Sequence, residues 1–236
     1  MKRFLIFALF ILTAIPASAG YYDNFKFADK NAMKPFARDL GSLLGTGTAN
    51  TARALGFSGF DIGIHGGAML KPSKANTVLK DSKAIGMGFV QLEIGMPYRI
   101  DGFIRGNEYE GVAVAGGGLR YGLWNVSDEK YKINAAITLL GNMATGKNFY
   151  AVHWNSTLVM SMNLPIVSPY ISCGVDSTYL EAQSMADPAL DDTSVRTTMP
   201  RYAAGLRAKI GLVYMSGEAA YTHGEMALGA GAGFRF

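Results

Sequence analysis

The sequence predicts an all-β fold, a transmembrane antiparallel up-and-down β-barrel of about ten strands (8 to 12), with a short N-terminal helical segment. From about residue 59 to the last residue, apolar side chains alternate with small or polar ones, which is the two-residue period of a β-strand. The second face of these segments carries mainly Gly, Ala, Ser, Thr and Asn, whereas a water-exposed sheet face is rich in Lys, Glu and Asp. Several segments also exceed the ~5 to 6 residues usual for strands of soluble sheets. These observations disfavour the alternative fold, a soluble β-sandwich.

The first 19 residues have the pattern of a secretory signal peptide. Lys2 and Arg3 precede an apolar run over residues 4–15, and Ala17 and Ala19 are the small residues of an A-x-A cleavage site. The run is too short for a membrane-spanning helix, which needs ~20 apolar residues. We therefore expect residues 1–19 to direct export and then to be removed.

Composition and charge exclude several classes of protein. The chain has 29 Gly, 12 Tyr and 13 Phe, which fits closely spaced strands with aromatic belts. The formal net charge of +4 falls to +2 without Lys2 and Arg3, too little to indicate nucleic-acid binding. The single cysteine, Cys173, is expected to be a small apolar residue on a strand. Nothing in the sequence indicates a cofactor.

Residues 20–56 do not alternate and are expected to form a separate N-terminal segment ahead of a barrel domain at 57–236. Within the segment, steps of three and four residues predict one apolar stripe of a short helix that ends near Gly45, made of Met33, Phe36, Leu40, Leu43 and Leu44. Pro35 is expected in the first turn of this helix. The stripe must be buried, and two sites are open: the barrel lumen, where the segment would act as a plug, and the space beneath the barrel.

The barrel strands follow in order from the alternation. We expect them at about 59–70, 84–96, 99–106, 110–123, 131–139, 148–164, 167–180, 199–214, 217–223 and 224–236. The longest expected loop is 181–198, which holds the acids Glu181, Asp187, Asp191 and Asp192. In the eighth strand, Tyr202 and Tyr214 fall at opposite ends of one apolar face, as the two aromatic girdles of a membrane barrel require.

The last strand also has two distinct faces. One carries Met226, Leu228, Ala230, Ala232, Phe234 and Phe236, and the other carries Gly229, Gly231, Gly233 and Arg235. This strand resembles the closing strand of Gram-negative outer-membrane β-barrels, in which a terminal aromatic strand is the signal read by the barrel-assembly machinery. The resemblance implies an outer-membrane location, contact with outer-membrane lipid, and assembly-signal roles for Phe234 and Phe236. Residues 36–45 and 53–64 also resemble the helical leader and first strand of uncharacterised outer-membrane barrel proteins.

Charged residues on the small-residue face are expected to point into the lumen. They are Asp61, His65, Glu93, Arg105, Arg120, Lys132, His153, Asp176, Arg201, Arg207, Lys209, Glu218 and Arg235. Side chains largely fill a barrel of this size, and a charge buried there has to be paired. Two interpretations stay open: an ion network that packs the interior, and a polar pathway or binding site.

No catalytic or metal-binding group of residues can be assembled from the sequence. His153 and Ser156 are three steps apart on one strand and so face opposite ways, while Asp61 and His65 are separated by ~13 Å. His223 flanks the last loop, where exposure is expected. The three histidines have no metal-ligand spacing.

Three functions stay open. The first is a structural barrel or a channel for small solutes or hydrophobic compounds, with the N-terminal segment as a partial plug. The second is a surface-interaction, adhesin-like barrel that acts through extracellular loops such as 181–198. The third is an outer-membrane hydrolase. The sequence specifies neither the solute nor the oligomeric state.

Overall fold

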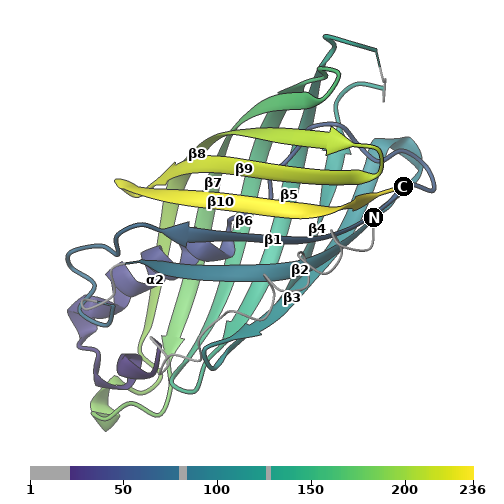
Figure 1. The fold of residues 1–236 in the computed structure, drawn as a ribbon. Coiled ribbons are helices and arrows are strands. Elements are labelled where there is room, and N and C mark those ends of the chain that lie inside the picture. Colours follow the sequence, from purple (N-terminus) through teal and green to yellow (C-terminus); the bar gives the residue numbers. More distant parts are fainter. Residues whose placement is uncertain (1–21, 80–83, 126–128) are drawn as a thin grey trace, which may run out of the picture.

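The computed structural model describes residues 22–79, 84–125 and 129–236, and these form a closed antiparallel barrel of ten strands (Figure 1). The strands are β1 (Phe60–Met69), β2 (Ile85–Gly95), β3 (Ile100–Tyr109), β4 (Val112–Gly122), β5 (Ile133–Thr145), β6 (Phe149–Met162), β7 (Val167–Ala182), β8 (Ser194–Ile210), β9 (Val213–Thr222) and β10 (Glu225–Arg235). Each strand pairs with its neighbours in sequence, and β1 pairs with β10. The expected fold class is confirmed. The expected signal peptide, residues 1–19, lies outside the described residues.

The seam between β1 and β10 closes the barrel. Its register sets Asp61 opposite Arg235 and His65 opposite Gly231. Beyond the strands, Phe60 N donates to Phe236 O at 3.2 Å and Phe236 N donates to Phe60 O at 2.8 Å. A Cβ at Gly231 would lie 2.5 Å from His65 Nδ1. Residue 231 therefore has to be glycine, because the His65 side chain lies directly against it across the seam.

The two faces of the wall have opposite character. Large apolar side chains such as Leu119, Ile171 and Phe234 are exposed on the outside, as expected for a surface that meets lipid. Their neighbours Arg120 and Arg235 are buried inside. Among the described residues, no helix has the length and apolar character needed to cross a bilayer.

We call the end of the barrel where β1 begins and β10 finishes the terminal end, and the opposite end the loop end. The described residues of the connections at the loop end are 70–79, 84, 110–111, 146–148, 183–193 and 223–224, and those at the terminal end are 96–99, 123–125, 129–132, 163–166 and 211–212. Two of these segments include short 3₁₀ helices, η2 (Pro97–Arg99) and η3 (Pro188–Leu190). The expected loop 181–198 is too long, because Glu181 pairs with Ser194 and Tyr179 pairs with Arg196 in the ladder between β7 and β8.

Tyr214 is not part of an outer aromatic girdle, contrary to the expectation from the sequence. The chain turns at residues 211–212, where Gly211 has a φ of +61°. The alternation therefore restarts in β9, and Tyr214 points into the lumen with 1% of its surface exposed. Tyr202 remains on the outer face.

The N-terminal segment lies inside the barrel. It contains the 3₁₀ helix η1 (Asp23–Phe27) and the helix α2 (Lys30–Leu44), whose N-cap Asp29 accepts a hydrogen bond from Ala32 N at 2.7 Å. Helix α2 contacts β1 and β2 on one side and β6, β7 and β8 on the other, which puts it in the lumen near the loop end (Figure 1). Pro35 is the sixth residue of α2, beyond the first turn where it was expected, so one helical hydrogen bond is missing.

The apolar core of the protein fills the loop-end half of the lumen. The whole expected stripe of α2 is buried there. The rings of Phe25, Phe36 and Phe149 pack together with centroids 4.7 to 5.2 Å apart. After α2, residues 45–59 run through the remaining, polar half of the lumen to reach β1 at the terminal end.

Candidate functional site in the barrel lumen

Side chains of the barrel wall hold the C-terminal end of α2. Arg105 on β3 donates through Nη2 to Leu44 O and through Nη1 to Thr46 O, the latter at 2.9 Å. Asn142 Nδ2 on β5 donates to Leu44 O at 2.9 Å, and Arg201 Nη2 on β8 donates to Ser42 O at 2.5 Å. Carbonyl groups at a helix C-terminus have no partner within the helix and carry partial negative charge. Arg105 and Arg201 of the barrel wall supply positive charge next to these carbonyl groups.

Arg105 has no carboxylate partner within 4 Å among the described residues. Its guanidinium lies 4.2 Å from the ring centroid of Phe89, and its Nε donates to Asn142 Oδ1 at 3.0 Å. The side chain is buried, so its charge is balanced by carbonyl and amide dipoles instead of a counter-ion. The N-terminal segment is therefore part of the environment that makes this buried cation tolerable.

Wall side chains also form hydrogen bonds with the backbone of residues 45–59, a segment that is neither helix nor strand. Gly47 N donates to Glu218 Oε1 at 3.3 Å, and Ala52 N donates to Ser161 Oγ at 3.1 Å. Leu55 N donates to both carboxylate oxygens of Asp101 at 3.0 Å. Buried backbone groups need partners, and this segment supplies only some of its own, such as Gly59 N to Gly56 O at 3.1 Å. The barrel wall is therefore complementary to the backbone of the N-terminal segment as well as to the side chains of that segment.

At the loop end, Asp39 ties α2 to two connections between strands. Its carboxylate accepts from Ser73 N at 3.0 Å, Ser73 Oγ at 2.7 Å and Asn76 Nδ2 at 2.6 Å, all in the segment that joins β1 to β2. His223 Nε2, between β9 and β10, lies 3.4 Å from Asp39 Oδ1. The His223 side chain is buried, which corrects the expected exposure. Burial lowers the pKa of His223, while the neighbouring Asp39 carboxylate acts in the opposite direction.

A chain of ion pairs crosses the polar half of the lumen. Arg235 Nε lies 2.9 Å from Asp61 Oδ2, and Arg235 Nη2 lies 3.8 Å from Glu93 Oε2. Glu93 Oε2 pairs in turn with Arg120 Nη1 at 2.9 Å. Tyr214 links Asp61 to His65, because its hydroxyl lies 2.8 Å from Asp61 Oδ1 and 3.0 Å from His65 Nε2. Each carboxylate has a cationic partner, as burial demands.

A second cluster surrounds Asp176. Its carboxylate accepts from Arg201 Nε at 2.7 Å and from Asn155 Nδ2 at 2.6 Å, with His153 Nε2 at 3.6 Å. His153 Nδ1 lies 3.0 Å from Thr178 Oγ1. Because Arg201 also binds Ser42 O, this cluster connects the wall to α2.

The structure distributes the expected lumen residues between two environments. Buried inside the barrel are Asp61, His65, Glu93, Arg105, Arg120, His153, Asp176, Arg201, Arg207 and Arg235. Glu218 lies with them, since it accepts from Gly47 N and from Tyr170 Oη. Lys132 and Lys209 differ from the expectation. Lys132 precedes β5 and lies 4.0 Å from Glu129, and Lys209 is exposed near the end of β8, because both stand at the terminal end, where solvent reaches.

Sequence reasoning missed Asp39, Asn142 and Asp101. Asp39 had a detectable signal, because it follows Phe36 by three residues and precedes Leu43 by four, which places a carboxylate on the apolar stripe. Its partners come from distant loops, and no spacing in the sequence identifies them.

Comparisons with known proteins concern the fold alone. No protein-family model matches the chain, and neither does any curated protein. Among solved structures, Ail, the attachment invasion locus protein of Yersinia pestis, is 15% identical, with 76% of this chain and 99% of that chain covered and a TM-score of 0.34. Neisserial surface protein A is 11% identical (77% and 97% covered, TM-score 0.31), and LpxR from Salmonella typhimurium is 8% identical (75% and 99% covered, TM-score 0.32). The closed barrel of ten antiparallel strands is the architecture that the alternating sequence predicted.

Proposed function

We propose that the protein is an integral outer-membrane barrel, exported by the signal peptide at residues 1–19, whose lumen is closed at rest by its own N-terminal segment, residues 22–59. One observation carries the proposal: buried Arg105 has its hydrogen-bond donors on the carbonyls of Leu44 and Thr46 and on Asn142. Without the segment, this cation would face the lumen with two of its acceptors removed. We call Arg105, Asn142 and Arg201 the seat of α2.

The terminal end faces the periplasm in this proposal. An even number of strands brings both ends of the barrel domain to one side of the membrane. The described residues 70–79 and the loop 183–193 then face the outside. The loop 183–193 is tied to the segment beneath it, since Ala186 N donates to Lys26 O at 2.9 Å. This contact favours a loop that covers the lumen over one that projects to meet a partner.

At rest the barrel is a structural element of the outer membrane. Small solutes pass only when α2 leaves its seat. The ion pairs in the polar half of the lumen remain when α2 leaves, because all four partners belong to the barrel wall. They are Asp61, Glu93, Arg120 and Arg235. The histidines have packing roles in this proposal instead of the catalytic roles of a hydrolase. His65 and His153 are buried, with ring nitrogens near Tyr214 Oη and Thr178 Oγ1.

Conductance across planar lipid bilayers tests the plug. The mature full-length chain should give little steady current, and a chain lacking residues 22–50 should give stable open channels. Heat-modifiable migration on unboiled gels checks that each chain has folded. Should the shortened chain fail to fold, Arg105→Met combined with Arg201→Met loosens the seat in the complete chain and should raise the open fraction. Equal currents from folded full-length and altered chains would overturn the proposal.

A further inference from the structure

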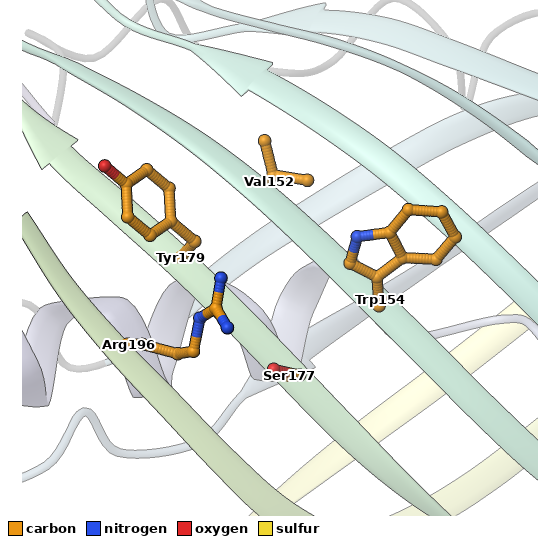
Figure 2. Close-up of a pocket in the computed structure, with 5 residues that line it drawn as sticks. All are labelled: Val152, Trp154, Ser177, Tyr179 and Arg196. Atoms are coloured by element: carbon orange, nitrogen blue, oxygen red, sulfur yellow. The ribbon is translucent and has the colours of Figure 1, made fainter.

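The outer surface of the barrel has a hollow near the loop end, and this hollow is separate from the lumen. It has a volume of about 440 Å³ and is lined by Val152, Trp154, Ser177, Tyr179 and Arg196 of β6, β7 and β8 (Figure 2). These residues belong to the lipid-facing set, because the residues next to them, His153, Thr178 and Thr197, are buried inside the barrel. Figure 2 shows the Arg196 guanidinium near the Tyr179 ring, with the Trp154 indole across the hollow.

The hollow lies where the outer face changes from apolar to polar. Along β7, the exposed apolar residue Val175 is followed on the same face by Ser177, whose Oγ lies 3.2 Å from Thr198 Oγ1 on β8. Val152 is ten residues from Met162, the last residue of β6 at the terminal end. With a rise of ~3.3 Å per residue and a strand tilt of ~40°, that separation is ~25 Å along the membrane normal, the height of the apolar band. The hollow therefore lies at the depth of the lipid headgroups of the outward-facing leaflet.

Arg196 provides a cation at this level. Its guanidinium lies 5.9 Å from the ring centroid of Tyr179, and no carboxylate lies within 4 Å of it among the described residues. The neighbouring acid, Glu181, accepts a hydrogen bond from Tyr179 Oη at 2.7 Å. An arginine on the lipid side of a barrel is tolerable near the interface, and its planar fork of donors suits phosphate oxygens. Tryptophan and tyrosine are the side chains enriched at the membrane–water interface.

We propose that this hollow binds the anionic phosphate headgroup of an outward-leaflet lipid. Arg196 and the Ser177 hydroxyl contact the phosphate, and an acyl chain lies along Trp154 and Val152. This inference rests on the proposed outer-membrane location and orientation of the barrel, and it is independent of the plug.

Quenching of Trp154 fluorescence measures occupancy at the site itself. The chain has two tryptophans, so Trp124→Phe leaves Trp154 as the single reporter. The folded protein in detergent is titrated with brominated phosphatidylglycerol and, separately, with brominated phosphatidylcholine of the same acyl chains. Half-quenching should need about fivefold less of the anionic lipid, the effect of one basic residue at a charged surface. Arg196→Gln should bring the two lipids within about twofold, and Arg196→Lys should keep most of the preference.

Arg99 is the matched control, because it also stacks on a tyrosine but at the terminal end. Its Nη1 donates to Leu123 O at 3.1 Å and its Nη2 to Tyr121 Oη at 2.8 Å, so its donors are engaged. Arg99→Gln should leave the preference unchanged. The proposal is overturned if Arg196→Gln retains the full preference, if Arg99→Gln removes as much of it, or if the unaltered site does not distinguish the two lipids.

Discussion

Arg105 shows how a single residue links the wall to the segment inside it. An arginine in a narrow lumen usually needs a carboxylate, and its neighbours Arg120 and Arg235 each have one. Arg105 instead donates to backbone carbonyls of the segment that fills the barrel. The sequence predicted that Arg105 faces inward, because alternation fixes the face of a strand residue. Its partners could not be predicted, since they lie about 60 positions away on an element whose location was open.

Replacing Arg105 should therefore destabilise the whole molecule. Arg105→Ala leaves the carbonyls of Leu44 and Thr46 short of donors, and we expect the free energy of unfolding to fall by about 3 kcal/mol. Arg99→Ala, at a half-exposed site, should cost less than about 1 kcal/mol. Urea titration followed by the gel shift of the folded barrel measures both. Similar losses for the two variants would contradict a special role for Arg105.

His223 should make stability depend on pH. Its pKa in the folded protein is lowered, chiefly by burial, so the unfolded chain takes up a proton more readily as the pH drops. The contribution of His223 is therefore fully present above its unfolded pKa of ~6.5 and is lost as the pH falls below that value toward the folded pKa. Urea midpoints measured from pH 7.5 to pH 5 should decline more steeply for the unaltered protein than for His223→Gln. Parallel declines would show that His223 does not contribute.

At the scale of elements, the close fit of α2 against β7 is the contact that sets the position of the helix. A Cβ on Gly41 would overlap Thr178 Oγ1 and would lie 3.3 Å from Thr178 Cβ. The helix can approach the wall at this point only because residue 41 has no side chain. The alternation predicted the existence of ten strands, but it missed where several of them end, because ladder pairs such as Tyr179 with Arg196 extend strands into polar segments.

Gly41→Ala should push α2 away from β7. Overpacking of this kind costs about 1 to 3 kcal/mol, and residues 22–59 should become more sensitive to protease in the folded barrel. Adding Thr178→Ala removes the clashing oxygen and should restore protection. Gly217→Ala is the control, since a Cβ there meets nothing closer than 4.0 Å. Equal protease sensitivity of Gly41→Ala and Gly217→Ala would contradict the proposed fit.

At the scale of the whole molecule, Phe236 belongs to the folded barrel, and the resemblance of the closing strand also implies a role for it in assembly. Its backbone is bonded to Phe60 across the seam, and its side chain is exposed on the outer face. The closing strand was predictable from sequence because both its faces and its aromatic end are local features. The filled lumen was not, because an amphipathic helix fits equally well inside the barrel or beneath it.

Phe236→Ala separates the two roles. The backbone bonds remain, so protein refolded in detergent should keep its stability to within about 1 kcal/mol. In cells, the amount of this variant in the outer membrane should drop several-fold, whereas Phe236→Tyr should assemble normally. Membrane fractionation with immunoblotting measures the amount, and normal levels of Phe236→Ala would remove Phe236 from the assembly signal.

The path of residues 22–59 constrains the order in which the barrel is built. This part of the chain starts at the loop end, crosses the length of the lumen and leaves at the terminal end, where β1 begins. A sheet that is hydrogen-bonded all the way round offers no lateral entrance for a helix carrying Phe36 and Leu40. We therefore expect the open sheet to curl around the segment, so that the pairing of β1 with β10 is the last step of biogenesis and traps its contents.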